Sequence, residues 1–516
     1  MDSNKIKVIL LLVLAAFAAL YLGVSAATAQ VEAVLWVVIA GTVTMCLMMG
    51  RRIYLLYPFM SALGLALPIP GNFSTELIAQ AIILGFSAIL FLMRKIPLRP
   101  AFTELEFWCL MAIFAVVQVY MRNPVGLNIF GGGMVGGKPY VLLAISVMAY
   151  YLISMLVVPP SELKWWVRLT MWGSWINFGL GAVAKFVPSI GRYLGASFST
   201  DVAQQDNGKN EAIDEGAAGR VTFVRTISLN LANWISSKVP PLRAMFHPVW
   251  AILIFSTLAA AAVSGYRSQL ATVCATYIVG TYYRGGLRSL LVAGFLGAMA
   301  IVLLALTNLI APLPPNVQRA LTFLPGTWEE RYKRDSEQSS EWRMEMWKEV
   351  LTSERYIKNK WLGDGLGFSS EQLQQMAALQ DSTATGIGGW DAHRESAMIA
   401  GDYHSGPVQT IRTIGYVGLL ILLIGLFRVS VHAHRQIERC RNTEWFGTAL
   451  FFGNTWIWMP VSWVFVFGSF TGGVAGLLLG TAMTRLLENN LPLPPYVVRR
   501  REPYILKRQS AGQARP

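Results

Sequence analysis

The chain has 516 residues, of which 54% are hydrophobic and only 14% are charged. These values exclude a soluble protein of this size, because soluble domains carry about 25% charged residues. Apolar runs of roughly 17–25 residues, the length that crosses a bilayer as a helix, recur along the chain. We therefore predict an all-α polytopic membrane protein with about 12–14 transmembrane helices and one sizeable, partly helical external domain between late helices.

The formal net charge of +14 would also suit a nucleic-acid-binding protein. However, the lysines and arginines gather at the ends of apolar runs, which is typical of the positive-inside rule. We therefore expect a lipid bilayer and no nucleic acid as partner.

The four cysteines lie in or beside apolar runs without CxxC spacing or nearby histidines, so we predict neither a disulfide nor a metal site. No cofactor is expected.

The amino terminus is basic and precedes an apolar run at 8–27. The triplet Ala27-Thr28-Ala29 resembles a signal-peptidase site, but the run is long for a signal peptide. We expect a retained first helix, and cleavage would leave the remaining topology unchanged. Further spans are predicted at 31–49, 53–69, 76–93, 105–120, 140–158 and 165–187.

The connections between these spans alternate in charge. Basic residues at 51–52 and 94–99 share a side with Lys5 and Lys7, which makes that side cytoplasmic. The glycines at 131–133 have no preceding strand and no GxGxxG spacing, so we predict a flexible external loop and not a phosphate cradle. The polar stretch 188–219 is a second external loop.

A weak apolar run at 221–239 must also cross the membrane or re-enter it. With 246–264 as the only span after the external loop, the basic clusters at 428–441 and 499–508 would both face outward, against the positive-inside rule. The weak run should face the protein interior because it carries polar side chains. These are Arg225, Asn230 and Asn233.

The later part of the chain contains the only extended polar segment between spans, at 311–405. Within it, 341–353 is predicted to form an amphipathic helix in which Arg343 and Trp347 share a face. Residues 364–367 read as a turn and 379–392 as a mobile loop.

Late spans are predicted at 246–264, 268–284, 288–310, 406–427, 446–466 and 468–486. The predicted division is an N-terminal bundle at 1–187, an external loop at 188–219, core helices at 220–310, an external domain at 311–405, C-terminal helices at 406–487 and a basic cytoplasmic tail at 488–516.

Three groups of residues on the predicted external face have chemistry in common. Arg267 stands at the outer end of a span, Arg343 stands beside Trp347, and His404 stands where the external domain meets a span. Arginine binds phosphate through a planar fork, and histidine can take a proton near neutral pH. Structural alternatives are an interface anchor for Arg267, an ordinary amphipathic helix for Arg343, and a loop-bonding helix entry for His404.

The same residues lie in motifs that resemble the O-antigen ligase and polymerase family. The most specific resemblance is the spacing His404-Ser405-x-x-Val408-Gln409-x-Ile411-x-x-x-Gly415-x-Val417-Gly418. Weaker resemblances are Ser264-Gly265-Tyr266-Arg267, Thr226-Ile227-Ser228-Leu229-Asn230-Leu231-Ala232, Arg343-x-x-x-Trp347 and Trp361-Leu362-Gly363-Asp364-Gly365-Leu366-Gly367. Departures are Tyr266 and Ser268 in the arginine motif, Arg412 where an acid is frequent, and Pro407 between the histidine and the glutamine.

The resemblance implies a metal-independent membrane glycosyltransferase of the bacterial inner membrane. Its donor would be a glycan on undecaprenyl diphosphate, and an acceptor hydroxyl would attack on the periplasmic side. His404 would be the catalytic base or acceptor-positioning residue, and Arg267 and Arg343 would bind the diphosphate. Trp347, Gln409 and Asn230 would be supporting residues. Weaker candidates for substrate contact are Asp391, His393 and Arg394.

The sequence leaves the acceptor open. Ligation to a lipopolysaccharide core, polymerisation of repeat units and glycosylation of a protein hydroxyl share the same motif, so the acceptor is a glycan, a lipid or a protein. The ligase is slightly favoured because one external domain precedes the histidine motif. A membrane transporter is the alternative from a different class, and it predicts inverted repeats and interrupted helices with charges at the bilayer midplane.

Overall fold

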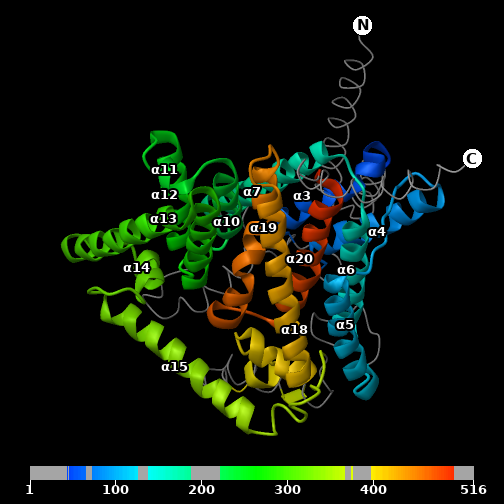
Figure 1. Ribbon diagram of the computed structural model, residues 1–516. Coiled ribbons are helices and arrows are strands. Elements are labelled where there is room, and N and C mark those ends of the chain that lie inside the picture. The colour runs from blue at the N-terminus through cyan, green and yellow to red at the C-terminus, as the bar shows by residue number, and fades with distance from the viewer. Residues whose placement is uncertain are drawn as a thin grey trace, which may run out of the picture. The chain divides into compact units, whose positions relative to one another are not determined.

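The computed structural model describes residues 44, 46–65, 73–125, 137–187, 221–366, 374–375, 395 and 397–492. Apart from isolated bridge residues, which include the antiparallel pair Leu98 and Leu156, the regular structure of these residues is helical (Figure 1). Among them, seven helices are long and apolar enough to cross a membrane. The predicted all-α, multi-pass membrane protein is confirmed.

The chain forms two compact units. One comprises Met1–Tyr54 and Gly85–Ile96, and the other comprises Leu55–Leu84 and Pro97–Pro516. The helix α4 (Thr75–Leu92) belongs to both. All contacts described below lie within the second unit, which contains every described site residue.

The predicted span at 53–69 does not form one crossing helix. After the 3-10 helix η1 (Gly50–Leu55), the helix α3 (Leu56–Leu63) has 8 residues and ends at Gly64, whose φ of 57° is left-handed. Eight residues rise about 12 Å, less than half of a bilayer core.

Helix α4 is joined to α6 (Lys138–Met155) by hydrogen bonds between their side chains. Tyr150 donates to Glu76 over 2.7 Å, and Ser146 donates to Gln80 over 2.8 Å. These contacts progress in opposite chain directions, so the two helices run antiparallel where these side chains meet. Strict alternation of the predicted spans would have made them parallel.

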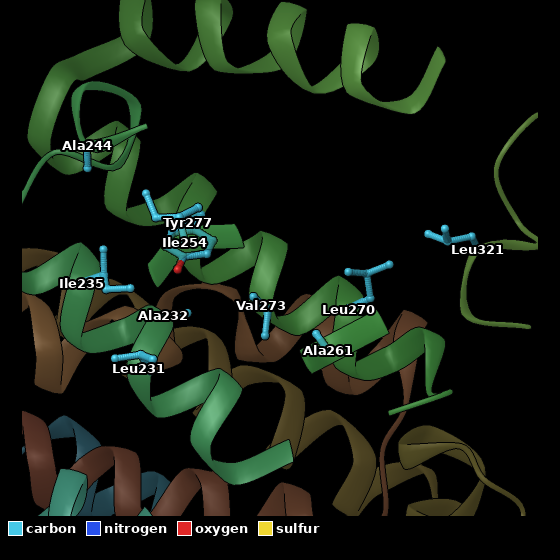
Figure 2. Packing of buried hydrophobic residues seen from close by; sticks show 10 residues of the cluster. All are labelled: Leu231, Ala232, Ile235, Ala244, Ile254, Ala261, Leu270, Val273, Tyr277 and Leu321. Carbon is cyan, nitrogen blue, oxygen red and sulfur yellow. The ribbon is translucent and has the colours of Figure 1, made fainter. Parts of the chain in front are cut away.

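Helices α10 (Val224–Lys238), α12 (Pro248–Val263) and α13 (Arg267–Ile310) pack around one apolar core (Figure 2). The weak run at 221–239 does form a helix, and its polar residues do face the interior. Asn233 is 5% exposed and donates to the carbonyl of Phe451, and Asn454 donates to Asn233. At 15 residues, α10 is shorter than a full span.

The predicted spans 268–284 and 288–310 correspond to the two parts of α13, which together have 44 residues. The helix bends at Gly286, whose backbone is non-helical with φ 71°. Glycine adopts this conformation without the steric cost that a side chain would add. The polar residues that follow include the short helix α14 (Pro315–Leu321) and the long helix α15 (Glu330–Thr352).

The carboxyl-terminal helices lie side by side (Figure 1) and correspond to the last three predicted spans. They are α18 (Gly406–Arg439), α19 (Phe446–Val461) with its π-helical extension η2 (Ser462–Val466), and α20 (Phe470–Asn490). Helix α18 also packs on α5 (Glu104–Arg122), and α5 joins α20 through a buried ion pair of Glu106 with Arg485. The helix α7 (Pro160–Phe186) contacts α3, α10 and α19.

Candidate active site

His404 directly precedes the N-cap of α18. The hydroxyl of Ser405 accepts from the backbone N–H of Val408, and Pro407 occupies the first turn, as its position in the sequence predicts. His404 itself has a left-handed backbone with φ 50°. This conformation is uncommon for residues other than glycine, although histidine tolerates it better than most.

The imidazole of His404 is half-buried between two aromatic rings. Its ring centroid lies 6.3 Å from that of Trp342 on α15 and 5.9 Å from that of Phe467, which follows η2. The side chain is 35% exposed, yet its Nδ1 atom is buried. Nδ1 lies 3.5 Å from Oδ1 of Asp402.

Gln409 connects this carboxylate to another helix. Its Nε2 donates to Oδ1 of Asp402 over 3.2 Å, and its Oε1 accepts from the backbone N–H of Phe470 over 2.9 Å. Gln409 is therefore a bridge between the residues before α18 and the first turn of α20.

Helix α15 supports the same loop from its other side. Trp347 donates its indole N–H to the carbonyl of Tyr403 over 2.7 Å. Met346 and Val350 on the same face are fully buried, together with Tyr403. The Nε of Arg343 is buried as well, so its side chain is partly enclosed by the packed face and does not extend freely into solvent. The predicted common face of Arg343 and Trp347 is the face that packs beside His404.

Tyr403 does not compete with His404 as an acid–base group at neutral pH. Burial, opposed by the positive charge of Arg412, raises the pKa of Tyr403 to about 12. Its hydroxyl donates to the carbonyl of Met398. Histidine is the side chain in this loop whose ordinary titration range includes neutral pH.

Arg267 is the first residue of α13 and follows Tyr266, whose ring contacts a guanidinium group. The guanidinium of Arg225 lies 4.8 Å from the ring centroid of Tyr266, and the Tyr266 N–H donates to the hydroxyl of Ser264. Helix α13 packs on α19, where Asn454 donates to the carbonyl of Thr276.

The position of Arg267 relative to His404 follows from how these helices pack. Residue pairs along α13 and α19 progress in opposite directions, from Thr276 with Asn454 to Tyr283 and Val279 near Leu450. The start of α13 therefore lies toward η2. Because both α13 and α18 contact η2, Arg267 and His404 belong to the same end of the helix bundle.

Asn230 has a different role in the structure. Its Nδ2 donates to the hydroxyl of Ser174 on α7 over 2.8 Å, so it connects two helices of the bundle. Asp391, His393 and Arg394 lie outside the described residues.

The glycine-rich segment 361–366 binds into a break in α18. At Gly415 the backbone leaves the helical region, with φ 75°. The freed carbonyl of Arg412 accepts from the N–H of Asp364, and the freed N–H of Tyr416 donates to the carbonyl of Lys360. A methyl group on Gly415 would overlap the carbonyl of Trp361.

The side chain of Asp364 holds this segment in shape. Its two carboxylate oxygens accept from the backbone N–H groups of Lys358 and Asn359. Arg122 of α5 donates to the carbonyls of Leu362 and Gly363. The predicted turn is therefore a docking element between α5 and α18, and its aspartate is used structurally.

The sequence-based reasoning missed Asp402, Trp342 and Phe467. Asp402 could have been noticed as an acid two residues before the histidine, whereas the two rings come from distant elements.

Within the described part of the chain, no group of three or more histidine, cysteine, aspartate or glutamate side chains could hold a metal ion. No protein-family model matches this chain, and no match was found among curated proteins. The functional assignment therefore depends on the residues and their geometry.

Proposed function

We propose that this protein is a glycosyltransferase of the O-antigen ligase type in a bacterial inner membrane. It would transfer a glycan from undecaprenyl diphosphate to an acceptor hydroxyl on the periplasmic side. The observation that carries the proposal is His404, half-exposed at the start of a membrane helix, with the arginine-bearing face of α15 packed beside it.

In this mechanism His404 removes the proton of the acceptor hydroxyl. The oxygen then bonds to the anomeric carbon of the donor, and the bond from that carbon to the diphosphate breaks. Arg267 and Arg343 neutralise the departing diphosphate, because guanidinium groups stay charged and bind phosphate oxygens in pairs. Trp347 and Gln409 hold the loop that carries His404, and Asn230 stabilises the bundle.

Ligation to lipopolysaccharide core is the form of this activity that we favour, because one external domain precedes the histidine motif. Repeat-unit polymerisation and protein glycosylation use the same groups. They differ only in which hydroxyl reaches His404.

A transporter is the second candidate, since α13 and α18 are both interrupted, as transporter helices often are. In such transporters the freed backbone groups face a cavity and bind the cargo. In α18 they bond instead to the segment 361–366 and to the carbonyl of Lys360, so they are not available to an ion or a solute. This difference favours the enzyme.

The test is transfer by purified protein from a lipid-diphosphate-linked glycan to an acceptor glycan. We expect His404→Ala to lower the transfer rate by about 10²-fold or more, which is the usual contribution of a general base. Arg343→Ala should also lose transfer. His247→Ala is the matched control, because His247 is exposed and precedes α12. Full transfer by His404→Ala would contradict the assignment.

Metal independence is tested in the same assay. Transfer should continue in excess chelator, since the arginines neutralise the diphosphate in this proposal. A strict requirement for Mg²⁺ would count against it.

A further inference from the structure

We infer that Asp402 is a positioning residue that binds the Nδ1 edge of His404, so that the acceptor proton is taken by Nε2. This inference rests on the proposed function, in which His404 is the base. It adds a residue that the histidine motif does not contain and assigns each ring nitrogen its own role.

The first observation is the unequal burial of the two sides of the imidazole. Nδ1 is buried and faces Oδ1 of Asp402, although about a third of the side chain is exposed. Nδ1 is covered by the protein, so in this proposal Nε2 is the ring nitrogen that meets the substrate hydroxyl.

The second observation is that Asp402 is held at both its backbone and its side chain. Its N–H donates to the carbonyl of Ala397, and its Oδ1 accepts from Gln409. Gln409 is in turn fixed by the backbone of Phe470. Tyr403, between the acid and the histidine, is fully buried and bonded to Trp347. The carboxylate is half-exposed, and these contacts hold it near the ring.

The separation of 3.5 Å between Nδ1 and Oδ1 exceeds an ordinary hydrogen bond. Hydrogen bonds of catalytic groups are often long without substrate and shorten in the reacting complex. The positive charge that forms on the imidazole would draw the carboxylate closer. As the acceptor oxygen bonds to the anomeric carbon and the diphosphate leaves, the proton moves from that oxygen to Nε2, and it later passes to water.

The charged groups on the elements around His404 set the direction of the pH effect. Asp402 lies on its own loop, Arg343 on α15 and Arg412 on α18, and the segment after η2 contributes the ring of Phe467. The two arginines disfavour protonated His404, and Asp402 favours it. Removing the charge of Asp402 should therefore lower the pKa of His404.

The experiment compares purified wild-type protein with Asp402→Asn, using lipid-diphosphate-linked glycan as donor. We expect kcat to fall on the order of 10-fold to 10²-fold, with little change in KM for the donor, since Asp402 orients the base and does not bind the diphosphate. The acid limb of the kcat profile should move to lower pH. Asp402→Glu should restore part of kcat, and Glu354→Gln, an exposed acid after α15, is the matched control.

The outcomes separate this inference from the proposed function. If the wild-type protein shows no transfer, or if His404→Ala retains it, the proposed function fails. If His404→Ala loses transfer while Asp402→Asn keeps both kcat and the acid limb, only the role of Asp402 is overturned. A lower kcat with an unmoved acid limb and a lower melting temperature would mean a structural role, which also overturns it.

Discussion

At the residue scale, the loop before α18 is held from several sides. Trp347 of α15 donates a hydrogen bond to the carbonyl of Tyr403, and Gln409 of α18 donates one to the carboxylate of Asp402. The backbone N–H of Phe470 in α20 holds Gln409 in turn. His404 has a left-handed backbone in the middle of these contacts. Strained residues persist where the surrounding structure determines their conformation, and such sites are often functional.

Trp347→Phe tests this support. The change replaces the indole by a smaller aromatic ring and removes the N–H that bonds the carbonyl of Tyr403, so we expect a loss of stability of about 1 kcal/mol or more. Thermal unfolding in detergent measures it, and glycan transfer should fall as His404 becomes less fixed. Trp361→Phe is the control, because Trp361 is 70% exposed. Equal behaviour of the two variants would show that the hydrogen bond does not matter.

At the scale of elements, α18 and the segment 361–366 form one structural feature. The helix breaks where the segment enters, and the segment supplies the hydrogen bonds that the helix loses. In a membrane protein an unsatisfied backbone group costs several kcal/mol, so break and segment depend on each other. The glycines of the two sequence motifs are therefore explained by one contact.

Gly415→Ala tests this dependence. The methyl group would overlap the Trp361 carbonyl, and the left-handed backbone adds strain, so we expect a loss of stability of about 2 kcal/mol or more. Gly297→Ala in α13 is the matched control. Its added methyl group meets nothing within 4 Å, and the change should leave stability equal or slightly higher. The melting temperatures of both variants measure the effect. An unchanged melting temperature for Gly415→Ala would contradict the proposed dependence of α18 on the segment 361–366.

At the scale of the whole molecule, the helices of the second unit place different chemistry at two ends. Arg267 and His404 share the end near η2. At the opposite end, Tyr283 bonds His434, and Arg441 donates to the carbonyl of Tyr283. Arg435, Arg439 and Arg441 lie toward this second end, which we propose faces the cytoplasm.

Thiol labelling of intact cells tests the proposed sides. Glu354→Cys, exposed after α15, should react with a membrane-impermeant maleimide in cells whose outer membrane is opened. Glu444→Cys, exposed between α18 and α19, should react only after the inner membrane is permeabilised. The wild-type protein gives the background, because three of its four cysteines are buried and Cys274 is partly buried. Reversed labelling of the two variants would refute the topology.

The sequence by itself determined the helical membrane class, most late spans and the helix start at Pro407. These follow from local chemistry: a bilayer requires apolar segments with internally satisfied backbones, and proline and serine favour a helix start. The common face of Arg343 and Trp347 was also predictable from helical spacing. Arg267 and His404 could be assigned to one side by counting spans, but not to neighbouring helices.

Only the tertiary structure decided what surrounds His404. The rings of Trp342 and Phe467 come from α15 and from the residues after η2, and no periodicity in the sequence relates them to the histidine. The early end of α3 and the docking of 361–366 into α18 were likewise not predicted. Such pairings depend on which distant surfaces fit together and satisfy each other's backbone groups, whereas sequence patterns report the preferences of neighbouring residues.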